Sequence, residues 1–145
     1  MLRIFKKRFL KLGRRQEGVA AVEFAIILPV LMLLVLGGMD LGDMYFVQHV
    51  ITNASREGAR YAAKYTGTAT LPTSGQISNY VISKLNYQNL NLNNLAVSAS
   101  YSGTSPDEIV TVTVQADKYW WILGSLGLSD PKILTARTAM AVEAP

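Results

Sequence analysis

The feature that most constrains this chain is a long apolar run near its N-terminus, residues 19–39, VAAVEFAIILPVLMLLVLGGM. The run holds 21 residues and a single charge. In a helix it would extend roughly 30 Å, which is the thickness of the hydrocarbon core of a bilayer. Pro29 would break a helix in water, but membrane helices tolerate proline. The run therefore predicts a transmembrane segment over residues 19–39.

Basic residues are concentrated before this run. Residues 1–18 contain seven of the 14 Lys and Arg residues and one acid, Glu17, so the remainder has a formal balance of −2. Basic residues that flank an apolar run typically lie on the cytoplasmic side of the membrane. We therefore expect a cytoplasmic N-terminus, and an extracytoplasmic location for everything after about residue 40. Because the remainder has no basic excess, no nucleic-acid partner is expected.

The helix is expected to continue beyond the membrane as an amphipathic helix over residues 40–65. Apolar or small residues recur there at alternating spacings of three and four, which is the pattern of one buried helix face. These residues are Met44, Val47, Ile51, Ala54, Gly58, Tyr61 and Tyr65. A hinge is predicted at Gly37, Gly38 and Gly42, and the breaker-rich segment TGTATLPTSG, residues 66–75, ends the helix.

The pattern of residues 66–145 predicts a small extracytoplasmic α+β domain. A short helix is expected over 76–86, and the residues of 95–101, 109–117 and 133–143 alternate between apolar and polar, as in strands. A hairpin loop is expected at YSGTSPDE, residues 101–108. Strands with one apolar and one polar face form antiparallel sheets that bury one side. Since that side needs a cover, we predict an α+β fold in which the long N-terminal helix packs on a small antiparallel sheet.

Three alternatives are open for the processing of the N-terminal segment. The first is a secretory signal peptide cleaved near Gly38, the second is an uncleaved signal anchor, and the third is cleavage between Gly18 and Val19. The apolar run is long for a signal peptide, whose core usually covers about 7–15 residues. The LGGMD that ends it is also a poor small-x-small cleavage site. The third alternative would leave the apolar run as the N-terminus of the mature protein.

Two short motifs favour the third alternative. Residues 14–24, RRQEGVAAVEF, end in Glu23 and Phe24 and resemble the prepilin cleavage motif of type IV pilin-like proteins. Residues 55–63, SREGARYAA, resemble the segment after the membrane helix in TadE-like proteins of the tight-adherence (Tad) pilus system. The resemblance implies a type IV pilin-like fold, cleavage by a prepilin peptidase after Gly18, and a leader over residues 1–18. Glu23 would then be the fifth residue of the mature chain.

Glu23 places a carboxylate inside the apolar run, where an ionisable side chain needs a partner. Cleavage after Gly18 would create a positively charged α-amine at Val19, and the resemblance implies that Glu23 pairs with this amine of a neighbouring subunit. The alternative is that Glu23 extends toward the membrane interface, near Arg14 or Arg15.

Small residues recur every four positions along the predicted helix, a spacing that lets another backbone approach closely. Three groups follow this spacing: Gly38 and Gly42; Ala54, Gly58 and Ala62; and Ser55, Ala59 and Ala63. Two partners are open for them, a helix of another subunit and the protein's own sheet.

The remaining polar and aromatic residues give no catalytic or metal-binding pattern. The chain has no cysteine, and His49 is its only histidine, so it has neither a thiol nor a second imidazole with which to bind a metal. Asp40 and Asp43 are predicted to be solvated. Residues 119–121, Tyr-Trp-Trp, are predicted to pack in the core or against a subunit, with a membrane-interface or adhesive contact as the alternative. We expect no cofactor, no metal and no enzymatic activity.

The predicted function is structural. The chain would be a minor pilin or pseudopilin of the bacterial inner membrane with a single span, a periplasmic domain and incorporation into an extracellular pilus. The resemblance implies as partners a prepilin peptidase, the major and other minor pilins, and the Tad inner-membrane platform with its ATPase. The alternative is a membrane-anchored ligand-binding or enzymatic domain with an uncleaved signal anchor.

Overall fold

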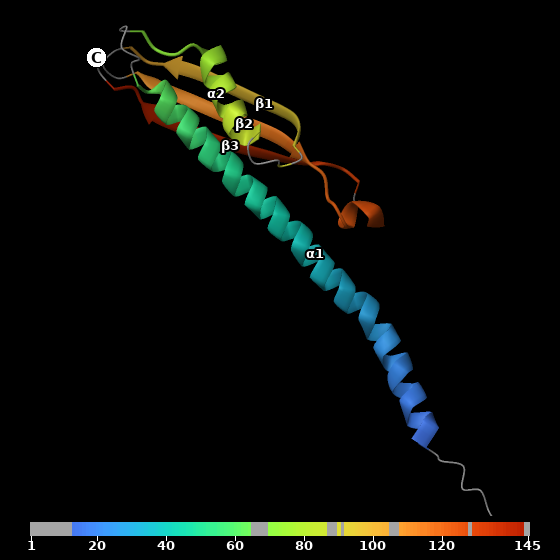
Figure 1. Cartoon of the computed structure of the whole chain (residues 1–145). Helices are drawn as coiled ribbons and strands as arrows, with labels where there is room; N and C mark the ends of the chain where they lie inside the picture. The colour runs from blue at the N-terminus through green and yellow to red at the C-terminus, as the bar shows by residue number, and fades with distance from the viewer. Residues whose placement is uncertain are drawn as a thin grey trace, which may run out of the picture. The chain divides into compact units, whose positions relative to one another are not determined.

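The computed structural model describes residues 13–64, 70–86, 90, 92–104, 108–127 and 129–143, with side chains from residue 18 onward. The elements are helix α1 (Gly13–Ala62), helix α2 (Ser74–Asn86), strands β1 (Asn93–Ser102) and β2 (Ile109–Lys118), the 3-10 helix η1 (Leu123–Leu126) and strand β3 (Lys132–Ala141) (Figure 1). The chain divides into two compact units, Met1–Gly37 and Gly38–Pro145, and α1 contributes to both.

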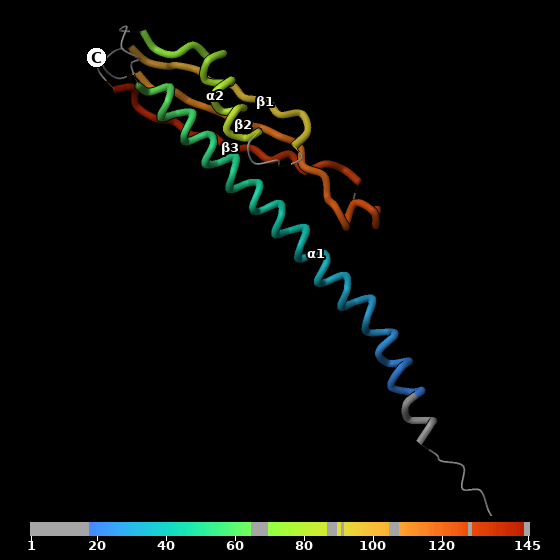
Figure 2. Tube along the Cα trace, in the orientation of Figure 1, coloured from blue at the N-terminus to red at the C-terminus, as the bar shows by residue number. Residues whose placement is uncertain are grey.

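Helix α1 is 50 residues long and includes Pro29. It begins at Gly13, within the predicted leader over residues 1–18. From residue 18 onward, Figure 2 shows its Cα trace as a continuous helix. Arg, Gln and Glu favour helix, and extending an existing helix by a few residues costs little free energy. The predictions for residues 1–12 and for Tyr65 lie outside the described residues.

The second unit contains a three-stranded antiparallel sheet in the order β1-β2-β3. Val114 at the centre of β2 is paired with Val97 of β1 and with Ala136 of β3. All three strands predicted from their alternating pattern are present, and the predicted α+β fold is confirmed. The end of β3 was predicted two residues too late, because Val142 and Glu143 leave the strand and donate their N–H groups to the carbonyls of Glu108 and Ala63.

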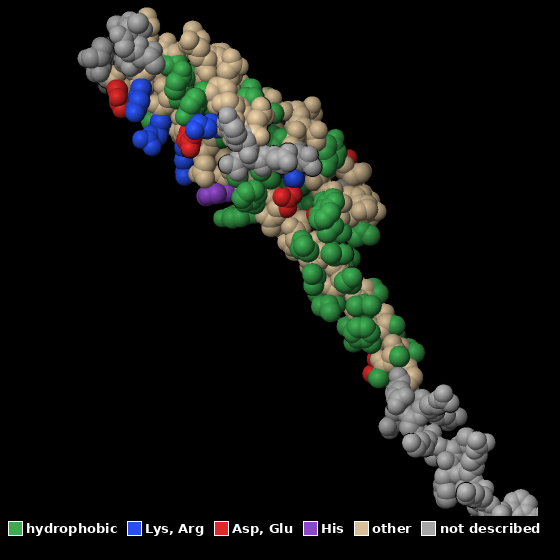
Figure 3. Space-filling view, viewed as in Figure 1, with side chains coloured by type: hydrophobic (Ala, Val, Ile, Leu, Met, Phe, Trp, Pro, Cys, Tyr) green, Lys and Arg blue, Asp and Glu red, His purple; other side chains and the backbone are tan. Residues whose placement is uncertain are grey.

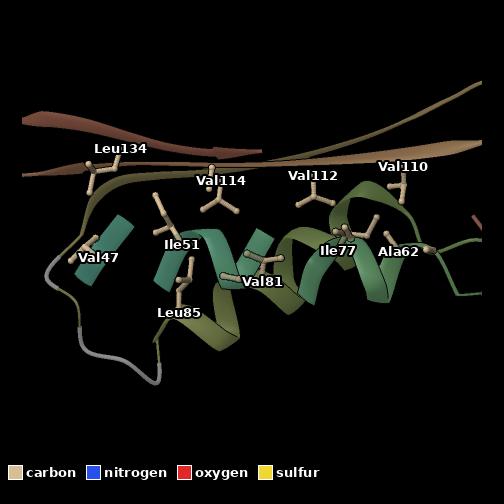
Figure 4. Close-up of a cluster of buried hydrophobic side chains, with 14 of the residues drawn as sticks. Val47, Ile51, Ala62, Ile77, Val81, Leu85, Val110, Val112, Val114 and Leu134 are labelled. Atoms are coloured by element: carbon tan, nitrogen blue, oxygen red, sulfur yellow. The ribbon is translucent and has the colours of Figure 1, made fainter. Parts of the chain in front are cut away.

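The core of this unit lies between one face of the sheet and the helices that cover it. Figure 4 shows the valine side chains of β2 pointing toward side chains of α1 and α2. The fully buried members include Val47, Ile51, Ile77, Val81, Val110, Val112 and Val114. Each such side chain stabilises the fold by about 1.5–3 kcal/mol relative to an exposed position. The predicted buried face of the long helix is confirmed at Met44, Val47, Ile51 and Ala54.

Candidate functional site

The apolar segment of α1 is a long exposed hydrophobic surface. All residues from Gly18 to Val35 are exposed, among them Val22, Phe24 and Ile26 (Figure 3). In the part of the chain that the structure describes, one helix, Gly18–Ala62, is long and apolar enough to cross a membrane. An apolar surface of this extent is unfavourable in water. It therefore suggests single-pass anchoring in a membrane.

The predicted processing site lies within this exposed helix. Gly18 and Val19 are both exposed, and a Cβ atom on Gly18 would meet no described atom within 4 Å apart from its own stretch of helix. Glu23 is exposed and, among the side chains that the structure describes, has no hydrogen bond or ion pair. The described side chains thus offer this carboxylate no positive partner.

A second exposed surface follows the apolar segment along α1, and we call it the outer face. It consists of Gly38, Leu41, Gly42, Tyr45, Phe46 and His49, all of which are exposed. Their spacings of three and four put them on one side of the helix. Neither Gly38 nor Gly42 has any atom within 4 Å of where a Cβ would be, so this side of the helix is open to another backbone.

The later small residues lie instead in the core of the domain. Ala54 and Ala62 are buried, and a Cβ on Gly58 would lie 2.5 Å from Val81 Cγ2 and 3.3 Å from Val112 Cγ1. Ser55, Ala59 and Ala63 are buried as well. These small residues therefore let α2 and the sheet approach α1, which is the second of the two alternatives. Only Gly38 and Gly42 remain open.

The prediction that Asp40 is solvated is wrong. Asp40 is only 3% exposed, and its carboxylate accepts hydrogen bonds from the backbone N–H groups of Ile122 at 2.9 Å and Leu123 at 2.7 Å. The first N–H groups of a helical turn have no partner within the turn, and a carboxylate satisfies them well. Asp43 is half-exposed, as predicted, but it forms an ion pair with Lys118 at 3.0 Å.

The aromatic residues after β2 are divided between core and surface. Trp120 packs partly against the core, whereas Trp121 is 78% exposed and Tyr119 is 50% exposed. Leu126, in the η1 turn that the sequence did not predict, is 65% exposed. A hollow of about 580 Å³ lies here, lined by both tryptophans, Tyr119, Met39, Asp40, Asp43, Leu92, Asn93 and Lys118.

Polar and aromatic groups also cluster where α1 ends against α2 and the sheet. Tyr61 and Tyr80 stack with ring centroids 4.6 Å apart, and Lys84 lies 5.5 Å from the ring of Tyr80. Tyr101 of β1 lies with its hydroxyl 2.8 Å from the Pro72 carbonyl and 3.1 Å from the Ala62 carbonyl. Burial first, then the charge of Glu108 and the nearby Tyr61, raise the pKa of Tyr101 above 10.0. These contacts fasten the segment after α1 to the sheet.

Within the described residues, no three His, Cys, Asp or Glu side chains come together as they would to hold a metal ion. The features that stand out are surfaces: the apolar segment with its unpaired carboxylate, the outer face, and the exposed aromatic residues beside Asp40.

The described chain combines one helix that is long and apolar enough to cross a membrane with a small α+β domain. Residues 18–60 match the family model described as TadE-like protein. The match begins at Gly18 and lies entirely within α1, and it confirms the TadE-like resemblance. It supports involvement of the chain in the Tad pilus system. No match was found among curated proteins or among solved structures.

Proposed function

We propose that this protein is a minor pilin or pseudopilin that a prepilin peptidase cleaves after Gly18 and that takes part in assembling a Tad-type adhesive pilus. The observation that carries the proposal is the exposed apolar helix, which bears Glu23 without a partner among the described side chains and matches the TadE-like model from Gly18 onward. Before assembly, residues 19–39 span the inner membrane, with the N-terminus in the cytoplasm and the domain in the periplasm. The protein catalyses no reaction in this role.

Cleavage would give the Glu23 carboxylate, which the membrane would surround, a positive partner. A new α-amine on Val19 carries a positive charge four residues from Glu23, close to the same depth in the membrane. In a medium of low dielectric, a carboxylate without a positive partner is strongly unfavourable. The amine of a neighbouring subunit would therefore fix the register in which two apolar helices pack. The outer face, with Gly38 and Gly42 open, offers such a helix a close approach.

The partners in this proposal are the prepilin peptidase, the major pilin and other minor pilins, and the Tad inner-membrane platform with its ATPase. The pilins would contact the apolar helix and the outer face. The peptidase would act at Gly18 on the cytoplasmic side, where the basic residues before the span are expected to remain.

The N-terminal residue of the mature protein tests the processing step. Sequencing of protein isolated from its native cell should give Val19, and Gly18→Leu should leave the chain at its precursor size. A mature protein that begins at Met1 would favour the uncleaved, membrane-anchored binding or enzymatic domain. One that begins near Met39 would favour a secreted protein.

Incorporation tests the role of Glu23. We expect Glu23→Gln to be inserted and cleaved as in the wild type but to be missing from sheared pili, because the neutral amide cannot pair with the amine. Glu17→Gln is the matched control, since it makes the same chemical change in the leader that cleavage removes. Normal incorporation of Glu23→Gln into pili would contradict the proposed role of the charge pair.

A further inference from the structure

The proposed processing and helix packing do not involve the exposed aromatic residues beside Asp40. We define the aromatic foot as Tyr119, Trp121 and Leu126, the exposed side chains around the turn between β2 and β3. Trp121 is 78% exposed, more than any large hydrophobic residue of the apolar run 19–39, and it belongs to the folded domain. Large apolar side chains exposed together indicate a surface that another apolar phase covers.

Hydrogen bonds hold the aromatic foot at a fixed position along helix α1. The carboxylate of Asp40 accepts the N–H groups of Ile122 and Leu123, which directly follow Trp121. Asp40 itself directly follows Met39, the last residue of the apolar run. Met39 and Trp121 both line the hollow of about 580 Å³ at this end of the domain. The aromatic side chains therefore lie beside the position at which α1 would leave the membrane.

We propose that the aromatic foot inserts into the interfacial layer of the outer leaflet, with lipid as its occupant, so that the domain rests on the membrane surface. This inference rests on the membrane anchoring in the proposed function. Tryptophan and tyrosine favour this layer because they combine an apolar ring with a polar N–H or O–H group. Groups bound there typically lie about 5–10 Å deep, at the boundary of headgroups and acyl chains.

The charges around the foot favour lipid contact that does not depend on headgroup charge. Lys118, which lines the same hollow as Trp121, is paired with Asp43 and is only 12% exposed in its side chain. Asp130 and Lys132, both exposed, contribute one charge of each sign. Since no basic excess faces the bilayer here, the contact should be as strong on neutral phosphatidylcholine as on vesicles that contain an anionic lipid.

The test uses the full chain with Trp120→Phe, so that Trp121 is the only tryptophan. The protein is reconstituted in phosphatidylcholine vesicles, with and without bromine on the acyl chains near the headgroup, and flotation confirms anchoring. We expect the brominated lipid to quench Trp121 fluorescence and acrylamide in the water to quench it poorly. The emission of Trp121 should lie at shorter wavelength than in the chain unfolded by denaturant without detergent. The same result is expected with an anionic lipid added.

A matched control places the same fluorophore at the other end of β2. Ile109 is exposed at the start of that strand, whereas the foot follows its end. Ile109→Trp, in a chain whose two natural tryptophans are Phe, should be quenched by acrylamide and not by brominated lipid. Quenching of Trp121 by brominated lipid, together with quenching of the tryptophan at position 109 by acrylamide alone, would show that the aromatic foot contacts the membrane.

Two fluorescence outcomes would overturn the inference. Quenching of Trp121 by acrylamide alone would mean that the foot lies in water. Protection from both quenchers, which disappears as protein is diluted in lipid, would mean that a second protein copy covers it. In either case flotation would leave the anchoring intact, whereas a chain that does not float would overturn anchoring and inference together. Failure of pilus assembly in the cell would affect the proposed function alone.

Discussion

Gly58 of α1 lies directly against Val81 of α2, so closely that a Cβ atom on Gly58 would be 2.5 Å from Val81 Cγ2. Val81 is fully buried and β-branched, which leaves its side chain little freedom to move aside. Val112 of β2 closes the other side at 3.3 Å. The absence of a side chain at position 58 therefore sets the distance between α1, α2 and the sheet.

Adding that one methyl group should destabilise the domain. Alanine gains up to about 1 kcal/mol over glycine in a helix. Forcing an extra carbon into a packed core typically costs about 1–3 kcal/mol, so after this gain Gly58→Ala should lower the free energy of unfolding by up to about 2 kcal/mol. Gly42→Ala is the control in the same helix, where nothing lies within 4 Å, and it should not be destabilising. Denaturant unfolding in detergent compares the two, and equal stability gains would contradict this account of position 58.

A part-buried polar pair, the buried Ser55 and the partly exposed Thr138, joins α1 to β3. The hydroxyls of Ser55 and Thr138 are 2.7 Å apart, and the Ser55 hydroxyl also lies 2.9 Å from the Thr52 carbonyl. Because Ser55 has one proton and gives it to Thr52, Thr138 is the donor between the two hydroxyls. Ser55→Ala should therefore leave a hydroxyl without an acceptor and cost about 1–3 kcal/mol, whereas Thr138→Val should cost about 0.5–1.5 kcal/mol.

A double-mutant cycle checks this assignment. The variant with both changes should lose less stability than the two single losses combined, because neither polar group then remains unpaired. A larger loss of stability for Thr138→Val than for Ser55→Ala would contradict the assignment of Thr138 as donor. Losses that simply add would show that the two hydroxyls do not interact.

The two aspartates after the apolar run should respond differently to truncation. Asp40→Ala leaves the N–H groups of Ile122 and Leu123 without their acceptor, which should cost about 1–3 kcal/mol. Asp43→Ala removes a half-exposed carboxylate from an ion pair with Lys118, whose ammonium keeps its hydrogen bond to the Leu90 carbonyl, and it should cost about 0–1 kcal/mol. Amide hydrogen exchange gives a local measurement. We expect faster exchange at 122 and 123 in Asp40→Ala but not in Asp43→Ala, and unchanged exchange in both would refute the role of Asp40.

Local patterns predicted much of this fold. Alternation along β2 identified the face that carries Val110, Val112 and Val114, and spacings of three and four identified the buried side of α1 from Met44 to Ala54. Both signals are local because every second or every third to fourth residue meets the same environment. The long apolar run predicted the span for the same reason, since it needs only composition and length.

The contacts of Asp40 could not be predicted in this way. Its partners Ile122 and Leu123 lie 82 and 83 residues further along the chain, and they offer backbone N–H groups that any residue type would carry. An acid that follows a membrane span has the same sequence signature whether it is solvated or caps a distant turn. Likewise, the four-residue spacing of Gly38 and Gly42 and of Ala54, Gly58 and Ala62 is one pattern. Only the sheet and α2 decide that the first pair stays open while the second group is buried.

Tyr101 should make the domain less stable at high pH. Its hydroxyl lies against the carbonyls of Ala62 and Pro72, and burial, followed by the charge of Glu108, raises its pKa in the folded state above the ordinary 10.0. The stabilisation from the neutral phenol is complete below pH 10.0. It is lost as the pH rises from there through the raised pKa, because the unfolded chain then releases this proton more readily than the folded one.

Two variants isolate this effect from that of other groups that titrate at high pH. Tyr101→Phe should be less stable at neutral pH, since it loses the hydroxyl contacts, but its stability should fall less steeply above pH 10.0 than that of the wild type. Glu108→Gln should reduce the steepness only in part, because burial raises the pKa of Tyr101 more than the charge does. Urea unfolding at a series of pH values gives all three curves, and phenolate absorbance follows the titration directly. Parallel curves for the wild type and Tyr101→Phe would show that Tyr101 does not contribute to the loss of stability at high pH.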